Sequence, residues 1–126
     1  MRVFGKNGTG NGEFDRPCCI AVGIDGNIVV SDCFNHQIQV FNSNGNFIRK
    51  FGQKGTENGN FKFPGGVAID SQMNIIVCDA NNHRIQIFDK NGNFLRKFGQ
   101  KGNGNGQFNC THTDGREMLS FSILLG

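Results

Sequence analysis

Apolar and polar residues alternate along most of this chain, with the period of two that is typical of half-buried β-strands. The clearest series of such runs occupies residues 66–70, 74–79, 84–88 and 94–98. Clusters of Gly, Asn, Asp and Ser separate the runs, as turns between antiparallel strands require. Apolar residues do not recur at intervals of three and four, so the pattern predicts strands and no helix.

The same pattern recurs with a period of 47 residues and without a gap. This shift aligns Asp32 with Asp79 and His36 with His83. A gapless repeat of this length indicates a propeller, a solenoid or an array. Four antiparallel strands per unit, with a longer loop to the next unit, are the plan of a β-propeller blade. We therefore predict an all-β chain with about two complete blades, a partial propeller over residues 1–109.

The last 17 residues, 110–126, do not continue the repeat. We expect them to form an aberrant tail that is truncated or disordered. Closed propellers have about 4–8 blades, so two blades leave strand edges and blade surfaces uncovered. The sequence thus predicts an isolated chain of marginal stability that can self-associate through its uncovered blade edges.

Composition adds few constraints to this prediction. The chain has 126 residues, of which 37% are hydrophobic and 18% charged, as in ordinary globular proteins. A net charge of +3 allows a nucleic-acid partner without implying one. Five cysteines without C-x-x-C spacing indicate reduced thiols inside a cell. With neither a signal peptide nor a membrane-length apolar run, we expect a cytoplasmic protein without membrane contact.

Strand alternation assigns the connections to two ends of the blades, and one end is the more basic. The turns that carry His36 and His83 share that end with the longer loops between repeats. Its basic residues are Lys6, Arg16, Lys54, Lys62, Arg84 and Lys101. These side chains could contact phosphates while nearby Phe rings stack on bases. The alternative, a solvated loop surface with no partner, stays open.

The remaining polar candidates are interpreted as parts of the turn between the second and third strands. They are Asp32, Asn35, His36, Asp79, Asn82 and His83. We expect each carboxylate to accept hydrogen bonds from the turn, each asparagine to adopt a turn or left-handed conformation, and each histidine to pack on a strand. A metal site needs several ligands, and each blade offers one such histidine. We predict no catalytic residue, no metal and no cofactor.

The segment "PGGVAIDSQMNIIVCDANNHRIQIFDKNGNFLRKFG" resembles a blade of the NHL-repeat family, which is named for Asn-His-Leu. The naming position reads Asn35-His36-Gln37 in one copy and Asn82-His83-Arg84 in the other, and the resemblance covers about residues 3–109. The chain is most similar to the C-terminal NHL domain of animal tripartite-motif proteins, in which a RING, B-boxes and a coiled coil precede the propeller.

This resemblance implies a fragment of a six-bladed propeller that binds RNA or proteins through its basic loop face. The RING of a longer parent would confer ubiquitin-ligase activity, but this chain contains no RING cysteine and histidine array. Two alternatives remain open. One is a scaffold that only recruits protein substrates, and the other is a metal-dependent propeller similar to the amidating lyases.

Overall fold

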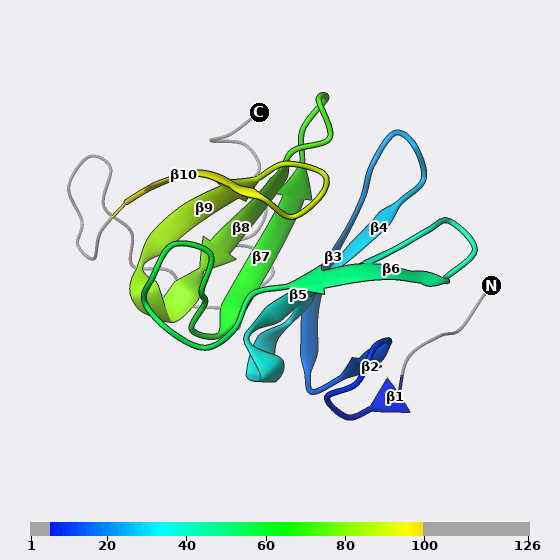
Figure 1. The fold of residues 1–126 in the computed structure, drawn as a ribbon, viewed down its shortest axis with the longest axis horizontal. Coiled ribbons are helices and arrows are strands. Elements are labelled where there is room, and N and C mark those ends of the chain that lie inside the picture. Colours follow the sequence, from blue (N-terminus) through cyan, green and yellow to red (C-terminus); the bar gives the residue numbers. More distant parts are fainter. Residues whose placement is uncertain (1–5, 100–126) are drawn as a thin grey trace.

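A computed structural model describes residues 6–99, apart from the side chain of Lys6. The main elements of this part are two four-stranded antiparallel sheets, which lie next to each other in Figure 1. A short parallel pair, β1 (Lys6–Asn7) and β2 (Glu13–Phe14), precedes them. The described residues contain no α-helix. The prediction of an all-β chain with two propeller-type blades is confirmed.

Each sheet follows the order of the chain, as the meander of a propeller blade does. Blade 1 contains β3 (Pro17–Val22), β4 (Ile28–Asp32), β5 (Gln37–Phe41) and β6 (Phe47–Phe51). Blade 2 contains β7 (Pro64–Ile69), β8 (Ile75–Asp79), β9 (Arg84–Phe88) and β10 (Phe94–Phe98). The first strand of blade 2 begins two residues before the predicted start, because an irregularity in the β7–β8 register allows Pro64 to pair with Asp79.

The main hydrophobic core lies between the two blades. Val29 pairs with Val40 across β4 and β5, so both side chains lie on the same face of blade 1. That face packs against Val67 and Val77 of blade 2, and all four side chains are at least 96% buried. Burial of side chains of this size contributes about 1.5–3 kcal/mol each, which makes this interface the main source of stability.

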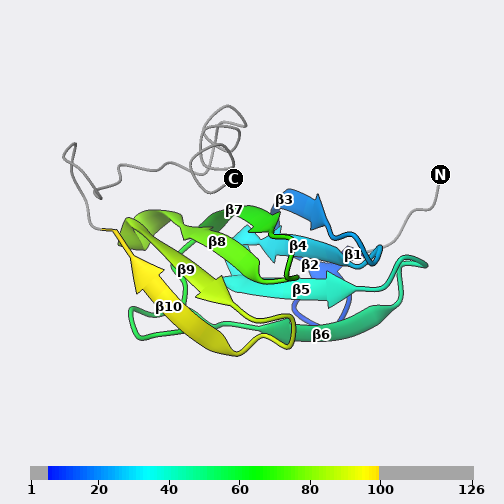
Figure 2. The same cartoon turned by 90° about the horizontal axis from the view of Figure 1, so that it is seen from above.

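Polar contacts and strand packing fix the two blades relative to each other. Strands β3 and β7 are neighbours, and Figure 2 shows them along the same side of the molecule. The buried hydroxyl of Ser31 donates to the carbonyl oxygen of Gly65 over 2.6 Å. On the outer strand β6, Arg49 Nη1 donates to Asn91 Oδ1 over 3.1 Å.

The turn between the second and third strands is a short 3-10 turn in both blades, at Cys33–Asn35 (η1) and Ala80–Asn82 (η2). His36 and His83 end these turns with φ values of 53° and 52°, in the left-handed region. The asparagines Asn35 and Asn82 lie within these turns, and the left-handed residue is the histidine that follows each of them. The histidine N–H must fold back to the first carbonyl of the turn, 3.2 Å away in blade 1, while the asparagine side chain is occupied elsewhere.

Several predicted features lie outside the described residues. They include the tail 110–126, the beginning of a third repeat and Lys101.

Candidate partner-binding face

The loop face is the end of the blades that carries η1, η2 and residues 52–63, the loop from blade 1 to blade 2. On it, four side chains from both blades form one continuous cluster, which we call the loop-face cluster: Arg16, Phe34, His36 and Phe63. The guanidinium of Arg16 lies 5.0 Å from the ring centroid of Phe34. Phe34 meets Phe63 edge to face at 5.3 Å, and Phe63 meets His36 in the same manner at 4.5 Å.

The cluster depends on two unusual backbone positions. Arg16 and Phe63 occupy equivalent places in the repeat, directly before the first proline of each blade, and have φ values of 60° and 53°. A left-handed conformation at a residue other than glycine costs about 1–3 kcal/mol, and such strain is found preferentially at functional sites. Both repeats therefore have a strained residue directly before the first strand of the blade. Before blade 2 this residue is Phe63, whose ring contacts Phe34 and His36 of blade 1.

The imidazole ring of His36 in blade 1 forms a hydrogen bond with the loop that leads into blade 2. The backbone N–H of Phe63 donates to His36 Nδ1 over 3.0 Å, so this nitrogen carries no proton in the bonded state. Partial burial of the ring, and then the charge of Lys54, lower the pKa of His36 below its usual value of about 6.5. The neutral imidazole is therefore favoured near pH 7, and His36 supplies ring surface to the cluster instead of charge.

The predicted basic residues differ in how the structure uses them. Arg16 and Lys54 are exposed, and Lys62 is half-buried with its backbone N–H donating to Asp79 Oδ1. Lys6 begins β1 and Lys101 lies outside the described residues. Three of the six predicted cations, Arg16, Lys54 and Lys62, are thus available around the loop-face cluster.

Arg84 does not belong to this exposed set, which corrects the prediction that it binds a partner. Its side chain is 9% exposed, and Nε forms an ion pair with Asp79 Oδ2 at 2.7 Å. Its two terminal nitrogens donate three more hydrogen bonds, to the carbonyl oxygens of Thr56, Glu57 and Asn60, each over 2.9 Å. A guanidinium enclosed in this way holds the inter-blade loop onto the blade and has little capacity left for a ligand.

Asp79 is the centre of this buried polar network. Its Oδ2 accepts hydrogen bonds from the side chains of Asn82, Arg84 and Gln86 over 2.7–3.1 Å, and the carboxylate is fully buried. The same arrangement, shifted by 47 residues, surrounds Asp32. Buried carboxylates require this number of donors, because an unsatisfied buried charge costs several kcal/mol.

The sequence did not single out Phe34 and Phe63, although both are central to the loop-face cluster. A signal was present in the repeat itself. Phe34 stands where the second copy has Asn81, and Phe63 stands where the first copy has Arg16. Both positions are polar in the other copy, so the repeat does not require an aromatic ring there for packing. This difference between the copies could have identified both rings as candidate site residues.

The cysteine nearest the cluster has the properties of a core residue. Cys33 is fully buried, and burial raises the pKa of its thiol far above the usual value. A nucleophilic cysteine needs the opposite, an environment that favours the thiolate. Among residues 6–99, no three His, Cys, Asp or Glu side chains are grouped as a metal site requires, and no helix is long and apolar enough to cross a membrane.

Comparison with known proteins agrees with the repeat and the blades. A family model described as "NHL repeat" matches residues 14–41 and 61–88, which contain the first three strands of each blade. Protein lin-41 of Caenorhabditis elegans is 48% identical over 48 residues, which are 38% of this chain and 4% of that protein. The B-box type zinc finger protein ncl-1 of the same species is 48% identical over 44 residues, 35% of this chain and 5% of its own length.

Protein brain tumor of Drosophila melanogaster is 41% identical over 44 residues, which are 35% of this chain and 4% of that protein. These relatives are tripartite-motif NHL proteins. The chain therefore spans only about one twentieth of the length of the curated relatives that it matches.

Proposed function

The chain carries two NHL repeats and is related to the tripartite-motif NHL proteins, and from this premise we propose that it is a non-catalytic module that binds single-stranded RNA through its loop face. One observation supports this most directly: the guanidinium of Arg16 lies over the exposed ring of Phe34, and this ring also contacts Phe63 of the inter-blade loop, which carries Lys54. RNA bases stack on aromatic rings and arginine planes, and lysines contact the phosphates between them.

The geometry suggests a division of roles. The part of Phe34 that remains exposed, 41% of the residue, offers a stacking surface for one base. Arg16 can contact the adjacent phosphate while its guanidinium stays against the ring, because its donors point outward from a stacked plane. Lys54 and Lys62 then extend the positive charge toward blade 2.

Fluorescence anisotropy with a labelled single-stranded RNA of mixed sequence tests this proposal. Phe34→Asn, which installs the residue of the second copy, should weaken binding about 10-fold or more through the lost stacking. Lys54→Glu should weaken binding and reduce the slope of log K against log salt by about 0.7 or more. The matched control is Lys90→Glu, because Lys90 is exposed in the turn between β9 and β10, at the end of the strands opposite the loop face. If both loop-face variants bind RNA as the control does, the proposal fails.

A protein partner is the alternative, in which the module recruits substrates for a ubiquitin ligase elsewhere in a longer parent. Phe34 is also the kind of exposed aromatic anchor that protein interfaces use. A defined partner whose binding persists after ribonuclease treatment, and is lost in Phe34→Asn, would favour this alternative over RNA.

A metal-dependent lyase is the weakest alternative. Metal analysis of the purified chain tests it directly, because stoichiometric zinc or calcium would support a lyase and contradict a purely binding role.

We also propose self-association through uncovered blade surfaces and a cytoplasmic location. The support for self-association is that β3 exposes Ile20 and Val22 by 57% and 63%. Exposed apolar strands at the edge of a domain are sites where chains pair or aggregate. Sedimentation velocity over a range of concentrations should show a mass above that of the monomer, and Ile20→Lys should lower it.

A further inference from the structure

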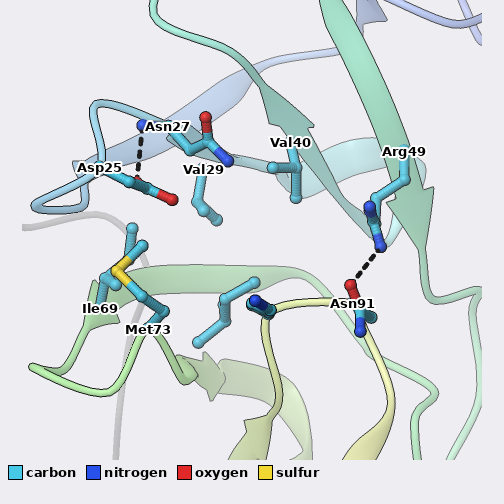
Figure 3. A pocket seen from close by; sticks show the side chains of 10 residues that line it. Asp25, Asn27, Val29, Val40, Arg49, Ile69, Met73 and Asn91 are labelled. Carbon is cyan, nitrogen blue, oxygen red and sulfur yellow. Dashed lines mark hydrogen bonds between the residues drawn. The ribbon is translucent and has the colours of Figure 1, made fainter.

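A pocket of about 260 Å³ lies between the two blades, at the end of the strands opposite the loop face. Figure 3 shows it from close by. Its apolar surface comes from β4, β5, β7, β8 and the turn before β8: Val29, Val40, Ile69, Met73 and Ile75. Its polar residues come from the β3–β4 turn, β6 and the β9–β10 turn: Asp25, Asn27, Arg49, Lys90 and Asn91.

The charges of the pocket are separated. In Figure 3, Asp25 and Asn27 lie at one end, and Arg49 and Asn91 lie at the other. Lys90 is adjacent to Asn91 in the chain and also lines the pocket. A ligand that spans the apolar surface therefore meets a carboxylate at one end and two cations at the other.

The hydrogen bonds at each end leave specific capacity unused. At the acidic end, Asp25 Oδ1 accepts the N–H of Asn27 over 2.9 Å. At the basic end, Arg49 Nη1 donates to Asn91, whereas Arg49 Nε is buried and has no hydrogen-bond partner among the described residues. Because Nε is enclosed, a ligand in the pocket meets the terminal nitrogens of this guanidinium, beside the bond to Asn91. A carboxylate there can accept charge-assisted hydrogen bonds from them.

The size of the pocket limits what can occupy it. Pockets for drug-sized ligands enclose about 300–1,000 Å³, so 260 Å³ suits a single amino-acid residue. That residue must carry an apolar side chain and an anionic group only a few bonds apart. An apolar residue with a free α-carboxylate has this chemistry, and its N–H provides the donor that Asp25 can accept.

We propose that this inter-blade pocket binds the C-terminal residue of a peptide. The apolar side chain of that residue lies on Val29, Val40 and Ile75, its carboxylate accepts hydrogen bonds from Arg49, and its N–H donates to Asp25. The rest of the peptide leaves through the open side of the pocket. This site is independent of the loop face, since it lies at the other end of the strands and shares no residue with the loop-face cluster.

The repeat provides matched positions for a test. Arg96 is the counterpart of Arg49 in blade 2, but it is exposed and does not line the pocket. Ser43 is the counterpart of Lys90, so Lys90→Ser installs a residue that this fold already accepts at an exposed turn position. Arg49→Gln and Arg96→Gln then remove the same charge at two equivalent positions, of which only one lines the pocket.

The experiment is a titration of the full ¹⁵N-labelled chain with N-acetyl-leucine, followed by NMR. We expect shifts of the side-chain amides of Asn27 and Asn91 with a dissociation constant of about 1 mM, as befits so small a ligand. The neutral analogue N-acetyl-leucinamide should bind about 10-fold more weakly. Arg49→Gln should abolish the shifts, Lys90→Ser should weaken binding about 2–5-fold, and Arg96→Gln should bind as the wild type does.

Four outcomes overturn the proposal. The first is no shift of these amides at about 10 mM ligand, roughly tenfold above the expected constant. The second is equal binding of the acid and the amide, and the third is an equal loss in Arg49→Gln and Arg96→Gln. The fourth is tighter binding of free leucine than of N-acetyl-leucine, which would assign the pocket to a free amino acid. An acetylated tetrapeptide that ends in leucine should bind at least as well as N-acetyl-leucine. Failure of RNA binding leaves all of these measurements unaffected, so the two proposals can fail separately.

Discussion

The two blades present different side chains to the same buried carboxylate. In blade 1, Gln37 donates one hydrogen bond to Asp32, over 2.9 Å. In blade 2, Arg84 occupies the equivalent position, donates to Asp79 and adds three hydrogen bonds to the carbonyls of the inter-blade loop. The turn therefore accepts either an amide or a guanidinium, and the guanidinium also fixes the loop before the blade. Arg84 thus holds the loop before blade 2 on that blade, and Gln37 does not hold the loop before blade 1 in this way.

The blades also differ in the environment of their first strand. Ile20 on β3 is 57% exposed, whereas its counterpart Val67 on β7 is 3% exposed. The two residues have similar chemistry and the same register in the repeat. They differ because Val67 lies on the face of blade 2 that packs against blade 1, whereas Ile20 lies on the face of blade 1 that is turned away from blade 2. Cys19 and Ala21, on the other face of β3, pack against the core between the blades.

The largest expected effect comes from breaking the network of Arg84. Arg84→Ala leaves Asp79 without its ion pair and removes three hydrogen bonds to the carbonyl oxygens of the inter-blade loop, so we expect a loss of about 3–5 kcal/mol in the free energy of unfolding. Gln37→Ala in blade 1 removes one hydrogen bond and should cost about 1–2 kcal/mol. Urea denaturation followed by circular dichroism measures both values.

Arg84→Gln provides the matched control, because it gives blade 2 the residue that blade 1 already uses. It should retain the bond to Asp79 and fall between the other two variants. Equal losses for Arg84→Ala and Gln37→Ala would show that the hydrogen bonds to the loop add no stability, and the contrast between the blades would disappear.

A smaller effect tests the contrast between the first strands. Val67→Ala removes buried methyl groups from the core between the blades and should lower the free energy of unfolding by about 2 kcal/mol. Ile20→Ala changes an exposed residue and should stay within about 0.5 kcal/mol. The same denaturation assay, performed at low protein concentration, compares them. A loss for Ile20→Ala as large as that for Val67→Ala would mean that β3 is covered in solution.

The smallest effect concerns pH and the interface contact of His36. Its pKa is lowered in the folded chain, first by burial and then by Lys54. The folded state therefore binds the proton less well than the unfolded state does. The contribution of this ring is complete above about pH 6.5, the ordinary value for histidine, and is lost as the pH falls through the lowered folded pKa.

An NMR titration of the histidine ring protons measures this directly. His36 should titrate below its ordinary value, and His36→Gln should flatten the decrease in melting temperature between about pH 7 and pH 5. A titration of His36 at or above the ordinary value would contradict the packing seen between the blades.

Much of the fold followed from the alternation of residues and the repeat. The strands of blade 2 were predicted to within two residues, because turns rich in Gly, Asn and Asp bound each run. The candidate site was less predictable. Arg16, Lys54 and Lys62 were expected on the loop face, and their role there stays a prediction. Arg84 was misassigned, because a cation at the start of a strand follows the same pattern whether it faces solvent or a buried carboxylate.

The sequence by itself determined the units of this protein: the 47-residue period, four strands per blade and the histidine turn in each. These are local properties, since side-chain alternation and turn chemistry act over a few neighbouring residues. Only the tertiary structure decided which equivalent positions of the two blades have different contacts and burial. The bond from Phe63 to His36, the burial of Val67 and the pocket beside Arg49 all arise where one blade packs on the next. A repeated sequence specifies identical blades, but stacking them in order gives each blade a different neighbour and therefore a different surface.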